Sequence, residues 1–231
     1  MIINGLQKLS LSDYDQKISC VIFTPGCNFK CHFCHNSSLV IDFMNNLIID
    51  EQEIFNFLEN KKGKLDAVVI SGGEPTLQED LKDFIIKVRG MGFKIKLDTN
   101  GTNPSVLKDL ISNKLVDYIA MDIKSDWGQL NTITNSNALL FKPKLEESIS
   151  ILLTSGVDYE FRTTLVNEIH NEQCIKNIAN IIKGSKKYVL QKYIDSENVI
   201  NKIYSPVSIE QVEKFKIILK DFVQKLETRN Y

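Results

Sequence analysis

Short runs rich in β-branched residues alternate with longer amphipathic segments along most of this chain. The short runs predict strands, and the longer segments, whose apolar residues recur at helical spacing, predict helices. The expected strands are residues 18–24, 67–71, 93–99, 118–123, 159–166 and 187–193. The expected helices are residues 51–60, 78–89, 104–112, 145–154, 171–182 and 208–226. Strands that alternate with helices in this way form parallel βαβ units.

Six βα units are fewer than the eight that close a full barrel. We therefore expect an α/β fold in which the units form an open, partial (β/α)6 barrel. The chain of 231 residues fits one domain, with an N-terminal segment 1–17, a barrel over about 18–193 and a C-terminal helical segment over about 205–228. The irregular stretch 125–142 follows the fourth strand, so it is either a solvated loop or a loop that faces the substrate.

The bulk properties exclude several classes of protein. A formal net charge of −1 gives no basic footprint for nucleic acid. The N-terminus has no apolar core of a signal peptide, and no stretch approaches the roughly 18 apolar residues of a membrane span. We expect a cytoplasmic protein that binds neither nucleic acid nor membrane. Three of its five cysteines are clustered, which favours metal binding in a reducing compartment over disulfides.

The clustered cysteines lie in the segment TPGCNFKCHFCHN, at Cys27, Cys31 and Cys34. Three thiolates from one loop can hold a metal centre and leave one metal position open for chemistry. The spacing differs from the C-x2-C pairs of structural zinc sites, and it lacks the fourth thiolate of a ferredoxin-type run. A zinc site that also uses His35 is the alternative. Cys20 and Cys174 stand alone and are expected to be buried as small apolar residues.

Two further motifs follow the second and third expected strands. SGGEP contains Gly72 and Gly73, where the backbone can approach a ligand closely, and Glu74, which adds a carboxylate. Taken alone, this motif also fits an ordinary turn between a strand and a helix. KLDTNG ends the next strand with Asp98 and Thr99, which could equally cap the following turn.

The fourth and fifth strands carry charged residues at alternate positions. Asp122 and Lys124 in AMDIKS project from one face, and so do Glu160, Arg162 and Thr164 in YEFRTTLV. Charged groups that face a barrel interior are costly unless they are paired or bind a ligand. Arg162 could hold a ligand carboxylate. Structural ion pairs, Asp122 with Lys124 and Arg162 with Glu160, are the alternatives.

The cysteine motif, C-x3-C-x-aromatic-C, resembles the signature of the radical S-adenosylmethionine (SAM) superfamily. Together with SGGEPTLQ, DTNG, MDIK, YEFRTT and YVLQ, it looks like the glycyl-radical-enzyme activating family, closest to the anaerobic ribonucleoside-triphosphate reductase activating proteins. The resemblance runs from about residue 6 to residue 193 and implies the open barrel. It also implies one [4Fe–4S] cluster on Cys27, Cys31 and Cys34 and a SAM pocket. That pocket would be formed by Asn36, Gly72, Gly73, Glu74, Asp98, Thr99, Asp122, Lys124 and Arg162.

The activity that the resemblance implies is reductive cleavage of SAM at the cluster. The resulting 5′-deoxyadenosyl radical removes a hydrogen atom from a glycine of a partner enzyme and leaves a glycyl radical. The implied partners are an anaerobic ribonucleoside-triphosphate reductase and an electron donor such as flavodoxin or ferredoxin. Three alternatives remain: a small-molecule enzyme like the 7-carboxy-7-deazaguanine synthases, an activating enzyme for a formate-lyase-type partner, and a non-catalytic zinc module.

Overall fold

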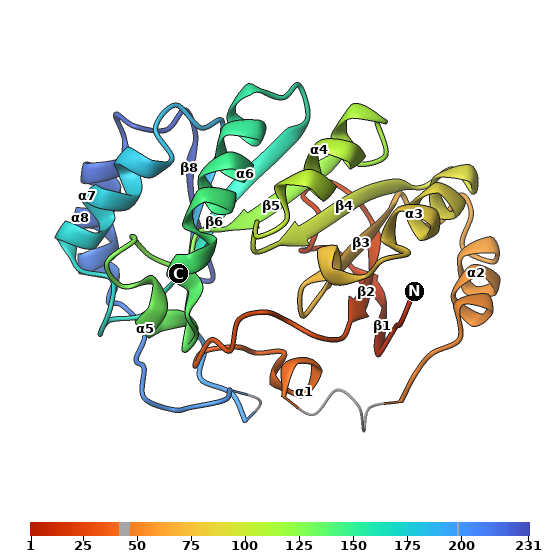
Figure 1. The fold of residues 1–231 in the computed structure, drawn as a ribbon, viewed down its shortest axis with the longest axis horizontal. Coiled ribbons are helices and arrows are strands. Elements are labelled where there is room, and N and C mark those ends of the chain that lie inside the picture. The colour runs from red at the N-terminus through yellow and green to blue at the C-terminus, as the bar shows by residue number, and fades with distance from the viewer. Residues whose placement is uncertain (42–46, 198) are drawn as a thin grey trace.

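A computed structural model describes residues 1–41, 47–197 and 199–231 of the chain. Across these residues a curved sheet runs through the molecule, and helices cover its outer face (Figure 1). The strands follow one another across the sheet in chain order: β1 (Gly5–Ser10), β2 (Ser19–Thr24), β3 (Ala67–Gly72), β4 (Lys94–Thr99), β5 (Tyr118–Asp122), β6 (Asp158–Leu165), β7 (Tyr188–Lys192) and β8 (Leu226–Arg229).

The helices occupy the connections between strands, as the sequence predicts. The α-helices are α1 (Ser37–Val40), α2 (Glu51–Glu59), α3 (Leu81–Gly90), α4 (Pro104–Ser112), α5 (Leu130–Thr134), α6 (Lys142–Thr154), α7 (Glu172–Ile181) and α8 (Ile209–Leu219). Two short 3₁₀ helices are η2 (Pro75–Leu77) and η3 (Ala138–Phe141). Side-chain caps explain three of the starting points: Asp50, Asn171 and Ser208 each accept a hydrogen bond from a backbone N–H in the first turn of α2, α7 and α8.

The sheet is an open barrel rather than a closed one. β1 is antiparallel to β2, whereas β2 to β8 are all parallel. Within the described residues β1 and β8 are the two edges and do not pair with each other. The predicted α/β fold, a partial barrel of alternating strands and helices, is therefore confirmed.

Three local predictions differ from the structure. The edge strands β1 and β8 were not expected, and the last helix ends at Leu219 instead of continuing to Leu226. Leu226 begins β8, where its neighbours pair with β7. The stretch 125–142, expected to be an irregular loop, contains α5 and η3.

Side chains alternate between the two faces of the sheet. The outer face, under the helices, is apolar, whereas the inner face is polar on β4, β5 and β6. Val68 and Ile70 of β3 pack in the main core with the helices, whereas Ala67 and Val69 join a small inner cluster with Tyr14. On β4, β5 and β6 the inner positions are polar or small: Lys96, Asp98, Ala120, Asp122, Glu160 and Arg162. Of these, Asp98, Asp122 and Arg162 lie toward the carboxyl ends of their strands. This end of the barrel therefore holds the chemistry-bearing side chains.

No helix in the described part of the chain is both long and apolar enough to cross a membrane.

Candidate active site

The cysteine loop leaves β2 at Gly26 and is fastened on two sides. Gly26 has φ of +81°, a conformation that favours glycine. Its N–H donates to the Leu39 carbonyl at 2.8 Å, and its carbonyl accepts from the Glu74 N–H at 2.7 Å. The loop is therefore tied to α1 and to the turn after β3 directly before Cys27.

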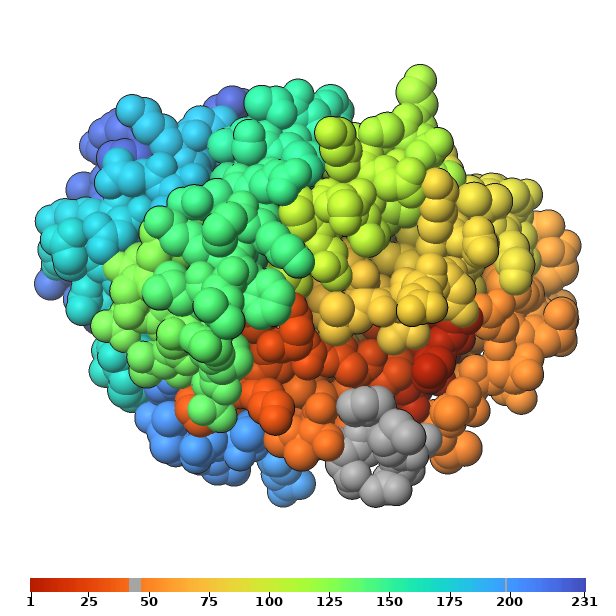
Figure 2. Space-filling model, in the orientation of Figure 1, coloured from red at the N-terminus to blue at the C-terminus, as the bar shows by residue number. Residues whose placement is uncertain are grey.

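All three clustered cysteines line one pocket at the carboxyl ends of the strands. The pocket is lined by Cys27, Phe29, Cys31, Phe33, Cys34, His35, Asn36, Val40, Ser71, Gly72, Gly73, Asp98, Thr99, Asn100, Asp122, Lys124, Arg162 and Thr164. Figure 2 shows the orange residues that follow β2 flanked by the green residues around α5 and η3 and by the yellow residues around η2. The pocket thus joins the cysteine loop to the polar inner face of the barrel.

Burial keeps these thiols protonated when no metal is bound. Burial raises the pKa of Cys27 to about 11 and that of Cys31 to about 12, and it also raises the pKa of Cys34. Metal binding would therefore release protons, because the thiolate is the ligand.

The donor set at the pocket, three thiols from one loop, fits the ligand chemistry of a [4Fe–4S] cluster. In the described part of the chain no three His, Cys, Asp or Glu side chains are arranged to hold one metal ion. A [4Fe–4S] cluster instead takes each thiolate on a different iron, so its ligands need only surround the cluster. His35 lines the same pocket, and its Nε2 lies 2.7 Å from the Ile194 carbonyl oxygen.

The other two cysteines lie in the core, as predicted. Cys20 on β2 is 0% exposed and Cys174 on α7 is 3% exposed. Burial raises the pKa of Cys20 to about 12 and that of Cys174 to about 11. Neither lines the pocket, so both serve as controls for the clustered thiols.

The two glycines of SGGEP bring the turn after β3 against the cysteine loop. A Cβ on Gly73 would lie 2.6 Å from the carbonyl carbon of Gly26 and closer still to its oxygen. Gly72 has φ of +119° and leaves no room for a Cβ beside the Thr24 backbone. The Gly72 carbonyl also accepts a hydrogen bond from the Asn36 amide at 3.0 Å. Two segments that are distant in sequence therefore share one wall of the pocket.

The Glu74 side chain does not lie at the pocket, although the sequence placed it among the cofactor-binding residues. It is fully buried and accepts hydrogen bonds from the Thr99 hydroxyl at 2.7 Å and the Asn100 N–H at 2.6 Å. It also accepts from the N–H and hydroxyl of Thr76. Glu74 therefore fixes the end of β4, and through it the residues that do face the pocket.

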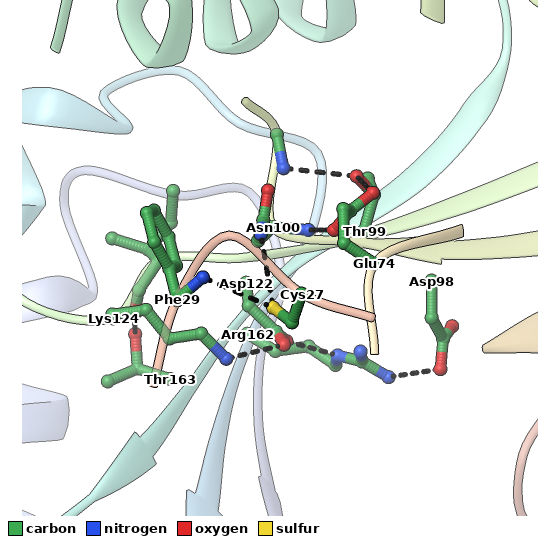
Figure 3. Close-up of polar contacts among 12 residues, drawn as sticks. Cys27, Phe29, Glu74, Asp98, Thr99, Asn100, Asp122, Lys124, Arg162 and Thr163 are labelled. Atoms are coloured by element: carbon green, nitrogen blue, oxygen red, sulfur yellow. Dashed lines mark hydrogen bonds and ion pairs between the residues drawn. The ribbon is translucent and has the colours of Figure 1, made fainter. Parts of the chain in front are cut away.

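Four charged residues that line the pocket form one ion-pair network, and Lys96 of β4 joins it with Nζ 3.3 Å from Asp98 Oδ1. Asp122 and Arg162 are register partners on β5 and β6, and Arg162 Nε donates to Asp122 Oδ1 at 2.9 Å. Arg162 also reaches Asp98 on β4, with Nη1 3.3 Å from Oδ2. Lys124 Nζ donates to the second oxygen of Asp122 at 2.9 Å. Figure 3 shows these contacts converging beside Cys27.

Opposite charges in the network hold Asp122 and Lys124 ionised. Burial raises the pKa of Asp122, but Arg162 and Lys124 outweigh it and bring the value to about 2. Burial likewise opposes the charge on Lys124, yet Asp122 holds its pKa above the ordinary value. Two carboxylates and two cations at one pocket match a zwitterionic ligand, which brings one charge of each sign. Arg162 pairs with Asp98 and Asp122, whereas Glu160 pairs with Lys187 and Arg229.

Later segments of the chain close over the cysteine loop. The Lys30 N–H donates to the Thr134 carbonyl of α5 at 3.0 Å, and Phe29 packs edge-on against Phe141 of η3. The Asn201 N–H donates to the His32 carbonyl at 3.0 Å, and the Tyr204 ring packs against His32. The stretch 125–142 therefore supports the cysteine loop.

The structure brings together all of the expected site residues except the Glu74 side chain. It adds Ser71, Asn100 and Phe29, which sequence reasoning did not select. Ser71 donates to Asp98 at 3.2 Å, and Asn100 contacts Cys27. These three residues lie in SGGEP, DTNG and the cysteine loop, so their place in these motifs could have indicated them from the sequence.

Comparison with known proteins gives one consistent family. A profile of the Radical SAM superfamily matches residues 21–159. A Methanocaldococcus jannaschii protein named "Putative glycyl-radical enzyme activating enzyme" is 37% identical over 83% of this chain and 80% of its own length. A Sulfurisphaera tokodaii protein named "Probable GTP 3',8-cyclase" is 27% identical over 91% of this chain and 66% of its own.

Comparison with solved structures supports the fold. A radical SAM methyltransferase from Sphaerobacter thermophilus covers 96% of this chain and 68% of its own, with a TM-score of 0.74 and 15% sequence identity.

Proposed function

The chain belongs to the radical SAM superfamily and is a radical SAM enzyme, and we propose that it activates a partner enzyme by forming a glycyl radical on it. The observation that carries the proposal is the pocket in which Cys27, Cys31 and Cys34 lie beside the ion pairs of Arg162 and Lys124 with Asp98 and Asp122. The relative at 37% identity, which bears the name of an activating enzyme, supports a protein glycine as the target.

We assign the three pocket thiols as the ligands of one [4Fe–4S] cluster. When bound, the cluster and SAM supply the electron and the carbon-centred radical that removes hydrogen. The protein's own part is to present three thiolates from one loop and to leave one iron free of protein ligands. The turn at Gly26 and the wall at Gly73 hold the loop in that conformation.

We assign the polar residues beside the thiols to the amino acid portion of SAM. Lys124 and Arg162 can each hold a carboxylate, and Asp98 and the Gly72 carbonyl can accept from an ammonium group. Asp122 keeps both cations in place through contacts of 2.9 Å. Thr99 and Asn36 complete the walls of the pocket. Glu74 does not line the pocket, but it fixes the end of β4 by accepting a hydrogen bond from the Thr99 hydroxyl.

Anaerobic ribonucleoside-triphosphate reductase is the partner that we propose, with flavodoxin or ferredoxin as electron donor. Glycine suits a radical site because it has no side chain to block approach to its α-carbon. The second candidate function is radical chemistry on a small molecule. The 27% identity to a protein with the name of a GTP 3',8-cyclase favours that candidate.

The two functions are separated by their products. The protein is reconstituted anaerobically with iron and sulfide, reduced, and mixed with SAM and one candidate glycyl-radical enzyme at a time. A glycyl doublet in the electron paramagnetic resonance (EPR) spectrum of the partner, with stoichiometric 5′-deoxyadenosine, supports activation. SAM cleavage that gives no protein radical with any partner, but yields a modified nucleotide from GTP, would overturn it.

A further inference from the structure

The sulfur of Cys27 receives two N–H donors, and one of them comes from a residue outside the cysteine loop. The Phe29 backbone N–H points to Cys27 Sγ at 3.4 Å. Nδ2 of Asn100, at the end of β4, lies 3.8 Å from the same sulfur. Figure 3 shows both contacts meeting at the Cys27 sulfur. Sulfur is large and weakly basic, so these lengths are ordinary for N–H···S hydrogen bonds.

The orientation of the Asn100 amide is determined by its other contacts. The Thr102 backbone N–H, which can only donate, lies 3.0 Å from Asn100 Oδ1. The oxygen therefore faces Thr102, and the NH₂ group faces Cys27. The same NH₂ group donates to Asn28 Oδ1 at 2.8 Å, Asn28 Nδ2 donates to the Thr102 hydroxyl at 2.9 Å, and that hydroxyl donates to Asn100 Oδ1 at 2.8 Å. The three side chains form a closed ring of hydrogen bonds.

The backbone of Asn100 is held as firmly as its side chain. Its N–H donates to Glu74 Oε2 at 2.6 Å, and Glu74 is fully buried. The next residue, Gly101, is fastened by its carbonyl, which accepts from the Ser148 hydroxyl at 2.6 Å. Asn100 itself is 5% exposed, so little of its surface is open to solvent. The donor is thus positioned before any ligand arrives.

A fixed donor at a ligand sulfur acts on the charge of that sulfur. Hydrogen bonds to the sulfurs are among the features that set the reduction potential of iron–sulfur clusters. An added electron makes the cluster and its thiolates more negative, and an N–H donor stabilises that form more than the oxidised one. This step rests on the proposed function, in which Cys27 is a cluster ligand.

We propose that Asn100 is a positioning residue that raises the reduction potential of the cluster by donating a hydrogen bond to Cys27. Thr102 and Asn28 orient the amide for this task, and Glu74 holds its backbone. The arrangement would favour transfer of an electron from the reductant to the cluster. It also gives the buried carboxylate of SGGEP a role that does not require contact with SAM.

The test uses the full chain, reconstituted anaerobically, with three variants. Asn100→Ala removes the donor, and Thr102→Val removes the hydroxyl that orients it while preserving shape. Asn103→Ala is the control, because Asn103 lies three residues away and donates to Thr76 rather than to a cysteine. Iron and sulfide per chain are measured first. The EPR signal of the reduced cluster is then followed in a potentiometric titration.

At the midpoint potential of the wild-type cluster, Asn100→Ala should show about a tenfold lower ratio of reduced to oxidised cluster. For a one-electron couple this corresponds to about 59 mV. Thr102→Val should shift in the same direction by a smaller amount, and Asn103→Ala should match the wild type. If Asn100→Ala fails to hold a cluster, Thr102→Val decides the question.

An unchanged midpoint potential in Asn100→Ala that holds its cluster overturns the inference. If Asn100→Ala holds no cluster, an unchanged midpoint potential in Thr102→Val overturns it instead. A shift of the same size in Asn103→Ala overturns it as well. These results leave the proposed function intact, since the wild-type cluster is still present. A wild-type chain that binds no cluster would instead overturn the proposed function itself.

Discussion

Replacement of Gly73 by alanine should separate the two backbone segments that form one wall of the pocket. The new Cβ would lie 2.6 Å from the Gly26 carbonyl carbon and closer still to its oxygen, whereas ordinary contact begins at 3.4 Å, so the segments must move apart by at least about 0.8 Å. Both partners are backbone and cannot rotate away. Two hydrogen bonds cross this junction, from the Gly73 N–H to the Thr24 carbonyl at 2.8 Å and from the Glu74 N–H to the Gly26 carbonyl at 2.7 Å.

A displacement of this size sets the expected cost. Both hydrogen bonds would stretch beyond the range in which they count as bonds, and each contributes about 1 kcal/mol. Overpacking adds about 1–3 kcal/mol of strain. We therefore expect the free energy of unfolding to fall by roughly 3–5 kcal/mol. Because Gly26 directly precedes Cys27, the iron content after reconstitution should also fall.

The matched control is Gly90→Ala at the last position of α3, where a Cβ would meet nothing within 4 Å. Such a replacement is neutral or stabilises by up to about 1 kcal/mol, because it restricts the unfolded chain. Anaerobic urea unfolding of the metal-free proteins, followed by circular dichroism, gives the free energies. If Gly73→Ala unfolds within 0.5 kcal/mol of Gly90→Ala and binds iron normally, the packing argument is wrong.

Two further predictions concern buried charge. Arg162→Met removes the cation that Asp98 and Asp122 share, in a site where the Arg162 side chain is only 12% exposed. Lys96 still pairs with Asp98 and Lys124 with Asp122, so the loss of stability should be about 2–3 kcal/mol rather than the full cost of an unpaired buried charge. Arg89→Met, which breaks the more exposed pair with Asp117, should cost under about 1 kcal/mol of stability. Urea unfolding of both variants measures the two losses, and equal losses would contradict this ranking. The second prediction concerns His170, whose pKa burial lowers to about 4 from the ordinary 6.5. Its Nδ1 accepts a hydrogen bond from the Val166 N–H at 2.9 Å, and its Nε2 lies 3.0 Å from the Lys124 carbonyl oxygen. Because the neutral ring is favoured in the folded state, its stabilisation is complete above pH 6.5 and is lost as the pH falls toward 4, by about 2–3 kcal/mol at pH 4.5. Unfolding at several pH values should show this loss in the wild type and a smaller one in His170→Asn, and parallel pH profiles would exclude His170 as the cause.

The sequence predicts the interior of the barrel better than its edges. Ala67–Gly72 and the other central strands are flanked on both sides, so their β-branched residues give a clear pattern. The edge strands lack it: Gly5–Ser10 has one fully buried residue, and Leu226–Arg229 has none. The spacing of apolar residues after Ser208 continues past Leu219, but tertiary pairing with β7 ends the helix and forms β8.

The site was predictable where topology alone determines position. Cys27, Asp98, Asp122 and Arg162 follow or end neighbouring parallel strands, whose carboxyl ends must meet. The direction of a side chain at a turn is not determined in this way. Glu74 could face either side of its turn, and only the hydrogen-bond donors around it in the folded protein show that it points inward.

Asn100 shows a second limit. Its amide carries no charge and no periodic pattern, so its contact with Cys27 depends on the folded ring with Asn28 and Thr102. Only the three-dimensional arrangement identifies it.

The most direct test of the central claim is the iron content and SAM cleavage of five cysteine variants. After anaerobic reconstitution and reduction, Cys27→Ala, Cys31→Ala and Cys34→Ala should each hold less iron and release no 5′-deoxyadenosine from SAM. Cys20→Ala and Cys174→Ala remove buried thiols outside the pocket and should keep both the cluster and the cleavage. Full cleavage in any one of the three pocket variants would contradict the account.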